Sequence, residues 1–282
     1  MASETNGYLE LSDGKLYYEI AGEGEPLVLS HAGFVDSRMW DDQWNDFTKR
    51  YRVIRFDMRG FGKSDRLAAP IARRDDLYHL LKHLGIARTV LLGCSMSGEI
   101  ILDFTLEHPE MVAALVVVST VPSGFELQGE PPQYLMEMMA AVEQGDLALA
   151  SELQNRIWID GPFRQPAQVD PRVRERAAEM NRIALANETF SKVDSAPLNP
   201  LDPPAVQRLS EVGVPTLIIA GGLDNPEILR AADVMTAAIS AAQKVILPDA
   251  AHMLNMEQPE AFNHVVLEFL DNRIYPAGAR AH

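Results

Sequence analysis

The residue most able to do chemistry is Ser95, in the stretch TVLLGCSMSGEI at positions 89–100. Val90 to Leu92 form a short apolar run typical of a buried strand, and an apolar helix is predicted from Glu99 to Leu106. A serine at the turn between them fits a nucleophile elbow, in which the positions two before and two after must be small. Gly93 and Ser97 meet this requirement, although Ser97 stands where a glycine is usual.

Two further reactive side chains follow apolar runs later in the chain. Asp224 comes shortly after PTLIIA (215–220), and His252 comes shortly after KVIL (244–247), with a predicted helix between the two runs. A right-handed strand-helix-strand crossover brings such loops to the same edge of a parallel sheet. We therefore expect both side chains at the edge that carries Ser95. Asp249 is the nearest rival acid.

The elements around these residues predict an α/β fold. A hairpin is expected around Asp13-Gly14, where turn residues separate two strands. Buried strands are expected at 26–30, 51–56, 90–92, 111–119, 215–220 and 244–247, and helices at 75–84, 99–106, 227–239 and 259–270. After the strand at 26–30 come His31-Ala32-Gly33-Phe34, a polar loop, Met39 and Trp40. Strands that alternate with helices indicate a mostly parallel sheet covered on both faces.

The stretch 121–204 differs, because helical patterns separated by proline and glycine replace buried strands. We expect helices at 133–144, 146–157 and 171–186, which would form a helical cap inserted into a core made of 1–120 and 205–282. The candidate substrate-binding residues are Phe34, Met136, Met139, Trp158 and Phe163. For the methionines, ordinary packing is the alternative that we favour.

Composition and residue spacing argue against nucleic-acid and membrane partners and against a metal site. The formal net charge is −15 over 282 residues, which disfavours binding to nucleic acid or to an anionic membrane surface. The absence of a long apolar stretch and of a signal-like N-terminus predicts a cytoplasmic protein. His79 and His83 have helical spacing that could bind a metal, but no third ligand follows at a recognisable distance, so we expect no metal site. The single cysteine, Cys94, is expected to be a buried filler.

With these motifs in order, the chain resembles the alpha/beta-hydrolase superfamily from Tyr8 to about Asn272. The resemblance rests on His31-Ala32-Gly33-Phe34, on Asp57-x-Arg59-Gly60-x-Gly62-x-Ser64, on the elbow at Ser95, and on Asp224 followed by His252. It implies a mostly parallel eight-stranded sheet flanked by helices. It also implies that the chain belongs to the branch of the superfamily that has a serine nucleophile and includes esterases and lactonases. The departures from the usual motifs, Ala32 and Ser97, do not touch a reacting group.

The resemblance also implies a role for each residue. Ser95 would be the nucleophile, His252 the base and Asp224 the acid that orients the imidazole. The backbone amides of Gly33 and Met96 would bind the oxyanion, with the amide of Phe34 as an alternative to Gly33. No cofactor is required for this chemistry.

We therefore expect a carboxylesterase-like enzyme that acts on small to medium esters or lactones. Enol-lactone hydrolysis resembling that of 3-oxoadipate enol-lactonases is the first alternative, followed by carbon-carbon hydrolysis and perhydrolysis on the same residues. A ligand receptor with slow turnover on the same fold is the alternative from another class.

Overall fold

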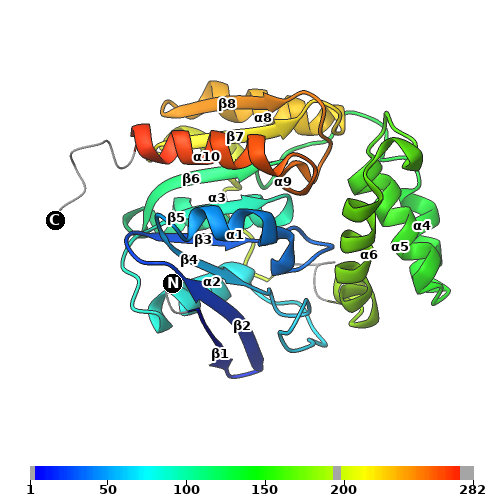
Figure 1. The fold of residues 1–282 in the computed structure, drawn as a ribbon, viewed down its shortest axis with the longest axis horizontal. Helices are drawn as coiled ribbons and strands as arrows, with labels where there is room; N and C mark the ends of the chain where they lie inside the picture. The colour runs from blue at the N-terminus through cyan, green and yellow to red at the C-terminus, as the bar shows by residue number, and fades with distance from the viewer. Residues whose placement is uncertain (1–3, 193–197, 274–282) are drawn as a thin grey trace.

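An eight-stranded sheet organises the computed structural model, which describes residues 4–192 and 198–273. The strand order is β1-β2-β4-β3-β5-β6-β7-β8 (Figure 1). The strands are β1 Thr5–Leu11, β2 Gly14–Ala21, β3 Pro26–Ser30, β4 Arg52–Phe56, β5 Thr89–Cys94, β6 Val112–Val118, β7 Thr216–Gly221 and β8 Ala242–Leu247.

Only the N-terminal edge of this sheet is antiparallel. β1 pairs with β2, and β2 with β4, in antiparallel register, whereas every pair from β4/β3 to β7/β8 is parallel. The predicted mostly parallel sheet is confirmed, and so is the hairpin around Asp13-Gly14. Because the parallel strands share a direction, their carboxyl ends form one edge, where ligands of such sheets gather.

Helices cover both faces of the sheet, and each face has its own apolar core. α1 Asp41–Phe47 and α10 Pro259–Arg273 pack on one face, whereas α2 Arg73–His83, α3 Met96–Glu107 and α8 Pro226–Ala238 pack on the other (Figure 1). The central strands β5 and β7 are buried along their whole length. This two-faced burial explains why those strands are continuous apolar runs rather than alternating ones.

The segment after β3 is more ordered than the expected polar loop. A 3-10 helix, η1 Ser37–Trp40, leads directly into α1. Trp40, Trp44 and Phe47 are buried there, and the Asp36 side chain accepts a hydrogen bond from the Arg38 amide at the start of η1. The polar residues between the aromatic ones hide the helical spacing, so the sequence pattern predicts no helix at this place.

The described residues between β6 and β7 form helices and loops without a strand. They include α4 Leu135–Glu143, α5 Leu147–Asn155, α6 Pro171–Ala186 and α7 Thr189–Lys192, and Figure 1 shows α4, α5 and α6 side by side at one end of the molecule. α4 and α5 share a small core around Met138 and Leu153, whereas Val173, Ala177 and Met180 of α6 join the main core. The division into core and cap segment 121–204 stays a prediction.

Candidate active site

Ser95 joins β5 to α3 in a strained conformation. Its backbone has φ 56° and ψ −121°, a combination that costs about 1–3 kcal/mol for a residue with a side chain. Hydrogen bonds hold it there: the Ser95 amide donates to the Val118 carbonyl at 2.8 Å, and the Thr120 hydroxyl donates to the Ser95 carbonyl at 2.7 Å. A Cβ on Gly93 would lie 2.6 Å from the Ser97 carbonyl oxygen, so the strand and helix approach too closely for any larger residue at 93.

Ser97 does more than leave space. Its buried hydroxyl accepts a hydrogen bond from the Cys94 amide at 3.0 Å and lies 2.7 Å from the Ser30 carbonyl, to which it donates. Ser30 is the last residue of β3, directly before the loop that contains Gly33. The serine that replaces the usual glycine therefore ties the elbow to the loop expected to bind the oxyanion.

Three side chains from separate loops meet at this edge of the sheet. His252 Nε2 lies 2.8 Å from Ser95 Oγ, and His252 Nδ1 lies 2.9 Å from Asp224 Oδ2. Asp224 and His252 are each only 2% exposed, and Asp224 Oδ1 also accepts the Asn225 amide at 2.7 Å. The chain of hydrogen bonds orients the imidazole toward the serine hydroxyl, and it includes Asp224 rather than the exposed Asp249.

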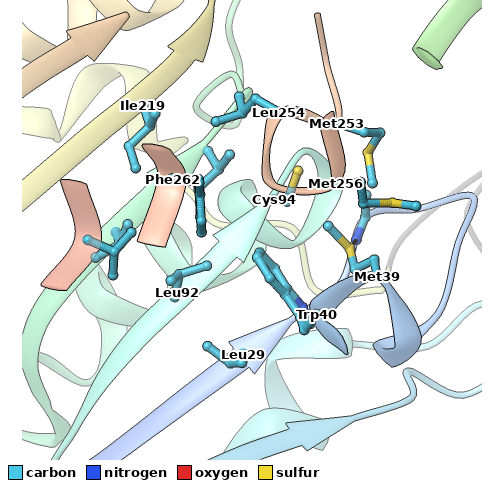
Figure 2. Close-up of a cluster of buried hydrophobic side chains, with 14 of the residues drawn as sticks. Leu29, Met39, Trp40, Leu92, Cys94, Ile219, Met253, Leu254, Met256 and Phe262 are labelled. Carbon is cyan, nitrogen blue, oxygen red and sulfur yellow. Dashed lines mark hydrogen bonds between the residues drawn. The ribbon is translucent and has the colours of Figure 1, made fainter. Parts of the chain in front are cut away.

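A buried apolar cluster contains the residues next to Ser95 and His252 in the sequence and so helps to fix the positions of both. Figure 2 shows Cys94 in the same cluster as Met253, Leu254 and Trp40. Cys94 directly precedes Ser95, and Met253 directly follows His252. Burying each large side chain of this kind contributes about 1.5–3 kcal/mol, so a few of them offset the strain at Ser95. Burial raises the pKa of the Cys94 thiol, which disfavours its reactive thiolate.

The loop after β3 brings Gly33 against Met96. A Cβ on Gly33 would lie 3.2 Å from Met96 Sδ. Among the described residues, neither the Gly33 nor the Met96 amide donates a hydrogen bond to another protein group, so both donors remain available. His31 shapes this loop: its Nδ1 lies 2.8 Å from the Ala32 carbonyl, and its Nε2 accepts the Met58 amide at 2.9 Å. Burial lowers the pKa of His31, which favours the neutral ring that this pairing requires.

A cavity of about 590 Å³ opens beside Ser95 and His252. Trp158 lines it, and its ring lies 4.9 Å from the His252 ring. Trp158 belongs to a π-helical turn, η3 Arg156–Asp160, which continues α5. Phe34 is buried, with its ring 6.4 Å from the Trp158 ring, and it is not one of the residues that line the cavity.

Besides Phe34, three more predicted pocket residues do not line this cavity, and the expectation for all four needs correction. Met136 is 72% exposed, Phe163 59% and Met139 38%. Met136 and Met139 lie on the outward side of α4, while Met138 of the same helix packs into the small core with α5. A dense run of methionines indicates an apolar helix, but it does not tell which side faces a ligand.

The structure adds lining residues that the sequence patterns do not single out. They are Glu99 of α3, Leu127, Pro131, Pro132 and Leu135 before and at the start of α4, and Ile228 of α8. Glu99 had a recognisable signal, because it stands one helical turn after Ser95 and so shares its side of α3. The proline-rich stretch before α4 showed no such signal, because its composition is that of an ordinary linker.

Comparison with known proteins places this chain in a family. A family model described as "alpha/beta hydrolase fold" matches residues 25–259. The chain belongs to the alpha/beta hydrolase fold family. This match includes Ser95, Asp224 and His252, the three residues that the structure brings together.

Relatives within the alpha/beta hydrolases carry several activities. The pimeloyl-[acyl-carrier protein] methyl ester esterase of Yersinia enterocolitica is 25% identical over 90% of this chain and 97% of its own. The 3-oxoadipate enol-lactonase 2 of Acinetobacter baylyi is 26% identical, covering 92% of this chain and 94% of its own. A solved structure of a hydrolase from Pseudomonas aeruginosa PA01 matches with a TM-score of 0.77 and 29% identity, over 94% of this chain and 98% of its own. A putative synthase from Bacillus subtilis matches at 27% identity, so family membership alone does not fix the reaction.

In residues 4–192 and 198–273, no helix is both long and apolar enough to cross a membrane.

Proposed function

We propose that this alpha/beta hydrolase cleaves carboxylic esters through an acyl-enzyme on Ser95. The observation that carries the proposal is the continuous hydrogen-bonded chain from Ser95 Oγ through His252 to Asp224. A serine hydroxyl becomes an effective nucleophile when a positioned imidazole removes its proton, and a buried carboxylate keeps that imidazole in the required orientation.

The reaction proceeds in two halves. In the first, Ser95 Oγ attacks the ester carbonyl while His252 Nε2 takes the hydroxyl proton, and the carbonyl oxygen gains the negative charge. The amides of Gly33 and Met96 donate to that oxyanion. As the intermediate collapses, the bond to the alkoxy group breaks and His252 returns its proton to the leaving alcohol.

In the second half, water takes the place of the alcohol. His252 removes a proton from the water, whose oxygen attacks the acyl carbon, and the bond to Ser95 Oγ breaks. His252 then protonates Ser95 and the carboxylic acid leaves. Asp224 stabilises the imidazolium each time it forms without itself taking the proton.

The cavity supports a substrate of small to medium size. Its volume of about 590 Å³ is within the range of small-molecule sites. Its walls include Leu127, Leu135, Trp158 and Ile228, which suit an apolar acyl or alcohol group. The likeness to an esterase from Yersinia enterocolitica supports ester hydrolysis.

Enol-lactone hydrolysis is the second candidate. The likeness to 3-oxoadipate enol-lactonase 2 favours it, because a cyclic ester would be opened by the same attack. Carbon-carbon hydrolysis, perhydrolysis and slow-turnover ligand binding use the same serine and are separated from ester hydrolysis by the products formed.

The test is hydrolysis of p-nitrophenyl esters of increasing acyl length by the wild-type protein and by Ser95→Ala. We expect turnover by the wild type and a loss of about 10⁴-fold or more in the variant. A fluorophosphonate probe followed by mass spectrometry should label the peptide that contains Ser95. Binding of a lactone without Ser95-dependent release of its hydroxy acid, together with no ester turnover, would favour the receptor.

A further inference from the structure

Glu99 occupies an unusual place beside the candidate nucleophile. Its amide donates to the Ser95 carbonyl at 3.3 Å, and its side chain lines the cavity that contains Ser95 and His252. Glu99 and Met96 also line a second cavity of about 480 Å³. Glu99 therefore lines two neighbouring spaces that a substrate could fill.

No described residue forms a direct ion pair with the Glu99 carboxyl group. Among the described residues, Glu99 makes no side-chain hydrogen bond or ion pair, whereas the Glu227 carboxylate in the same cavity is paired with Arg230 at 2.5 Å. Glu130, also in the lining, is exposed to solvent. The described lining of the Ser95 cavity contains acidic side chains and no lysine or arginine.

We propose that Glu99 sets the charge preference of the site by excluding anionic substrates and admitting uncharged or cationic esters. The inference rests on the ester hydrolysis proposed above. A carboxylate in a half-buried cavity repels a negative charge more strongly than one in water, because the surroundings screen it less. Placed one turn from Ser95, Glu99 would meet the part of the substrate next to the scissile bond.

The charges around Glu99 make this preference depend on pH. Burial, with a contribution from the nearby Asp103, raises the pKa of Glu99 to about 7, and Arg74 opposes the shift. Arg73 and Arg74 of α2 and Asp103 of α3 line the second cavity, while Glu130, Glu227 of α8 and His252 line the first. Glu99 is therefore mainly ionised above about pH 7 and mainly neutral below it, so exclusion of anions should weaken as the pH falls.

A matched pair of substrates tests the inference: the p-nitrophenyl esters of 4-sulfobutyrate and 4-(methylsulfonyl)butyrate. They are similar in size, and the sulfonate stays ionised across the accessible pH range. The measured quantity is the ratio of kcat/KM for the sulfone to kcat/KM for the sulfonate. Any effect of pH on the hydrolytic step that both substrates share cancels in this ratio.

We expect the sulfone to be preferred about tenfold above pH 8, with the ratio falling as the pH decreases through about 7. In Glu99→Gln the ratio should be close to one and independent of pH. The control is Glu110→Gln, which makes the same change in net charge at an exposed residue just before β6, at the opposite edge of the sheet. It should keep the wild-type ratio.

The outcomes separate this inference from the proposed function. If the sulfone ester is hydrolysed by Ser95 but the ratio is near one, or is unchanged in Glu99→Gln, the role of Glu99 is wrong and ester hydrolysis stands. A glutamate that only stabilises the first turn of α3 would change the urea midpoint of the variant and leave the ratio intact. If neither ester is hydrolysed, ester hydrolysis and this inference are both overturned.

Discussion

Side chains at the carboxyl edge of the parallel strands are positioned differently from those on the helices between β6 and β7. At the edge, Ser95, Asp224 and His252 each follow a strand closely, and backbone hydrogen bonds fix the strand ends. Between β6 and β7, α4 packs on α5 and α5 also packs on α6, and the choice of cavity-lining residue depends on how those helices rotate. Positions fixed by a strand end are therefore readable from sequence, while positions fixed by helix packing are not.

The strongest test of this difference is the pair Asp224→Asn and Asp249→Asn. Asp224 contacts His252 Nδ1, whereas Asp249 is exposed in the same loop as the histidine. We expect Asp224→Asn to lower kcat for p-nitrophenyl esters by about 10³–10⁴-fold, because an amide supports the wrong tautomer of the histidine. Asp249→Asn should keep wild-type activity. The reverse result would show that the loop after β7 does not position the acid.

A second test probes the hydroxyl that ties the elbow to β3. Ser97→Ala removes the partner of the Cys94 amide and of the Ser30 carbonyl, both in the buried interior. We expect a loss of about 1–3 kcal/mol in the free energy of unfolding, measured by urea denaturation. The fall in kcat, expressed as an activation free energy, should be smaller than this loss.

The matched control for this variant is Ser151→Ala. Ser151 is also buried, but among the described residues its hydroxyl has no hydrogen-bond partner. Its replacement should change the stability by less than about 0.5 kcal/mol. Equal losses in the two variants would mean that the bonds of Ser97 contribute little.

The smallest effects are expected among the helices between β6 and β7. Trp158→Ala should lower kcat/KM for medium-chain esters by about tenfold, mainly through KM, because it removes an apolar wall next to His252 without touching a reacting atom. Met136→Ala, at a side chain 72% exposed, should stay within about twofold of the wild type. If Met136→Ala matched Trp158→Ala, α4 would face the substrate with the side that is exposed here.

Much of the fold follows from local patterns. The strands β3 and β4 begin and end within a residue of their apolar runs, because a strand buried on both faces is apolar throughout. Helix α1 could not be predicted in this way, because it is buried on one side only. Polar residues that face solvent separate its buried Trp44 and Phe47, so the sequence shows no continuous apolar run. Cytoplasmic location and the absence of nucleic-acid or membrane partners stay predictions.

The sequence by itself determined the order of the strands along the chain, the small residues around Ser95, and the placement of Asp224 and His252 shortly after strands. These are local properties, governed by the period of apolar residues and by the space that a tight turn allows. Only the tertiary structure decided that Ser97 bonds to Ser30, that Trp158 rather than Met136 lines the cavity, and that Glu99 makes no ion pair with any described residue. Those outcomes depend on segments far apart in the chain coming into contact, and no local pattern records the rotation of a helix or the pairing of its charges.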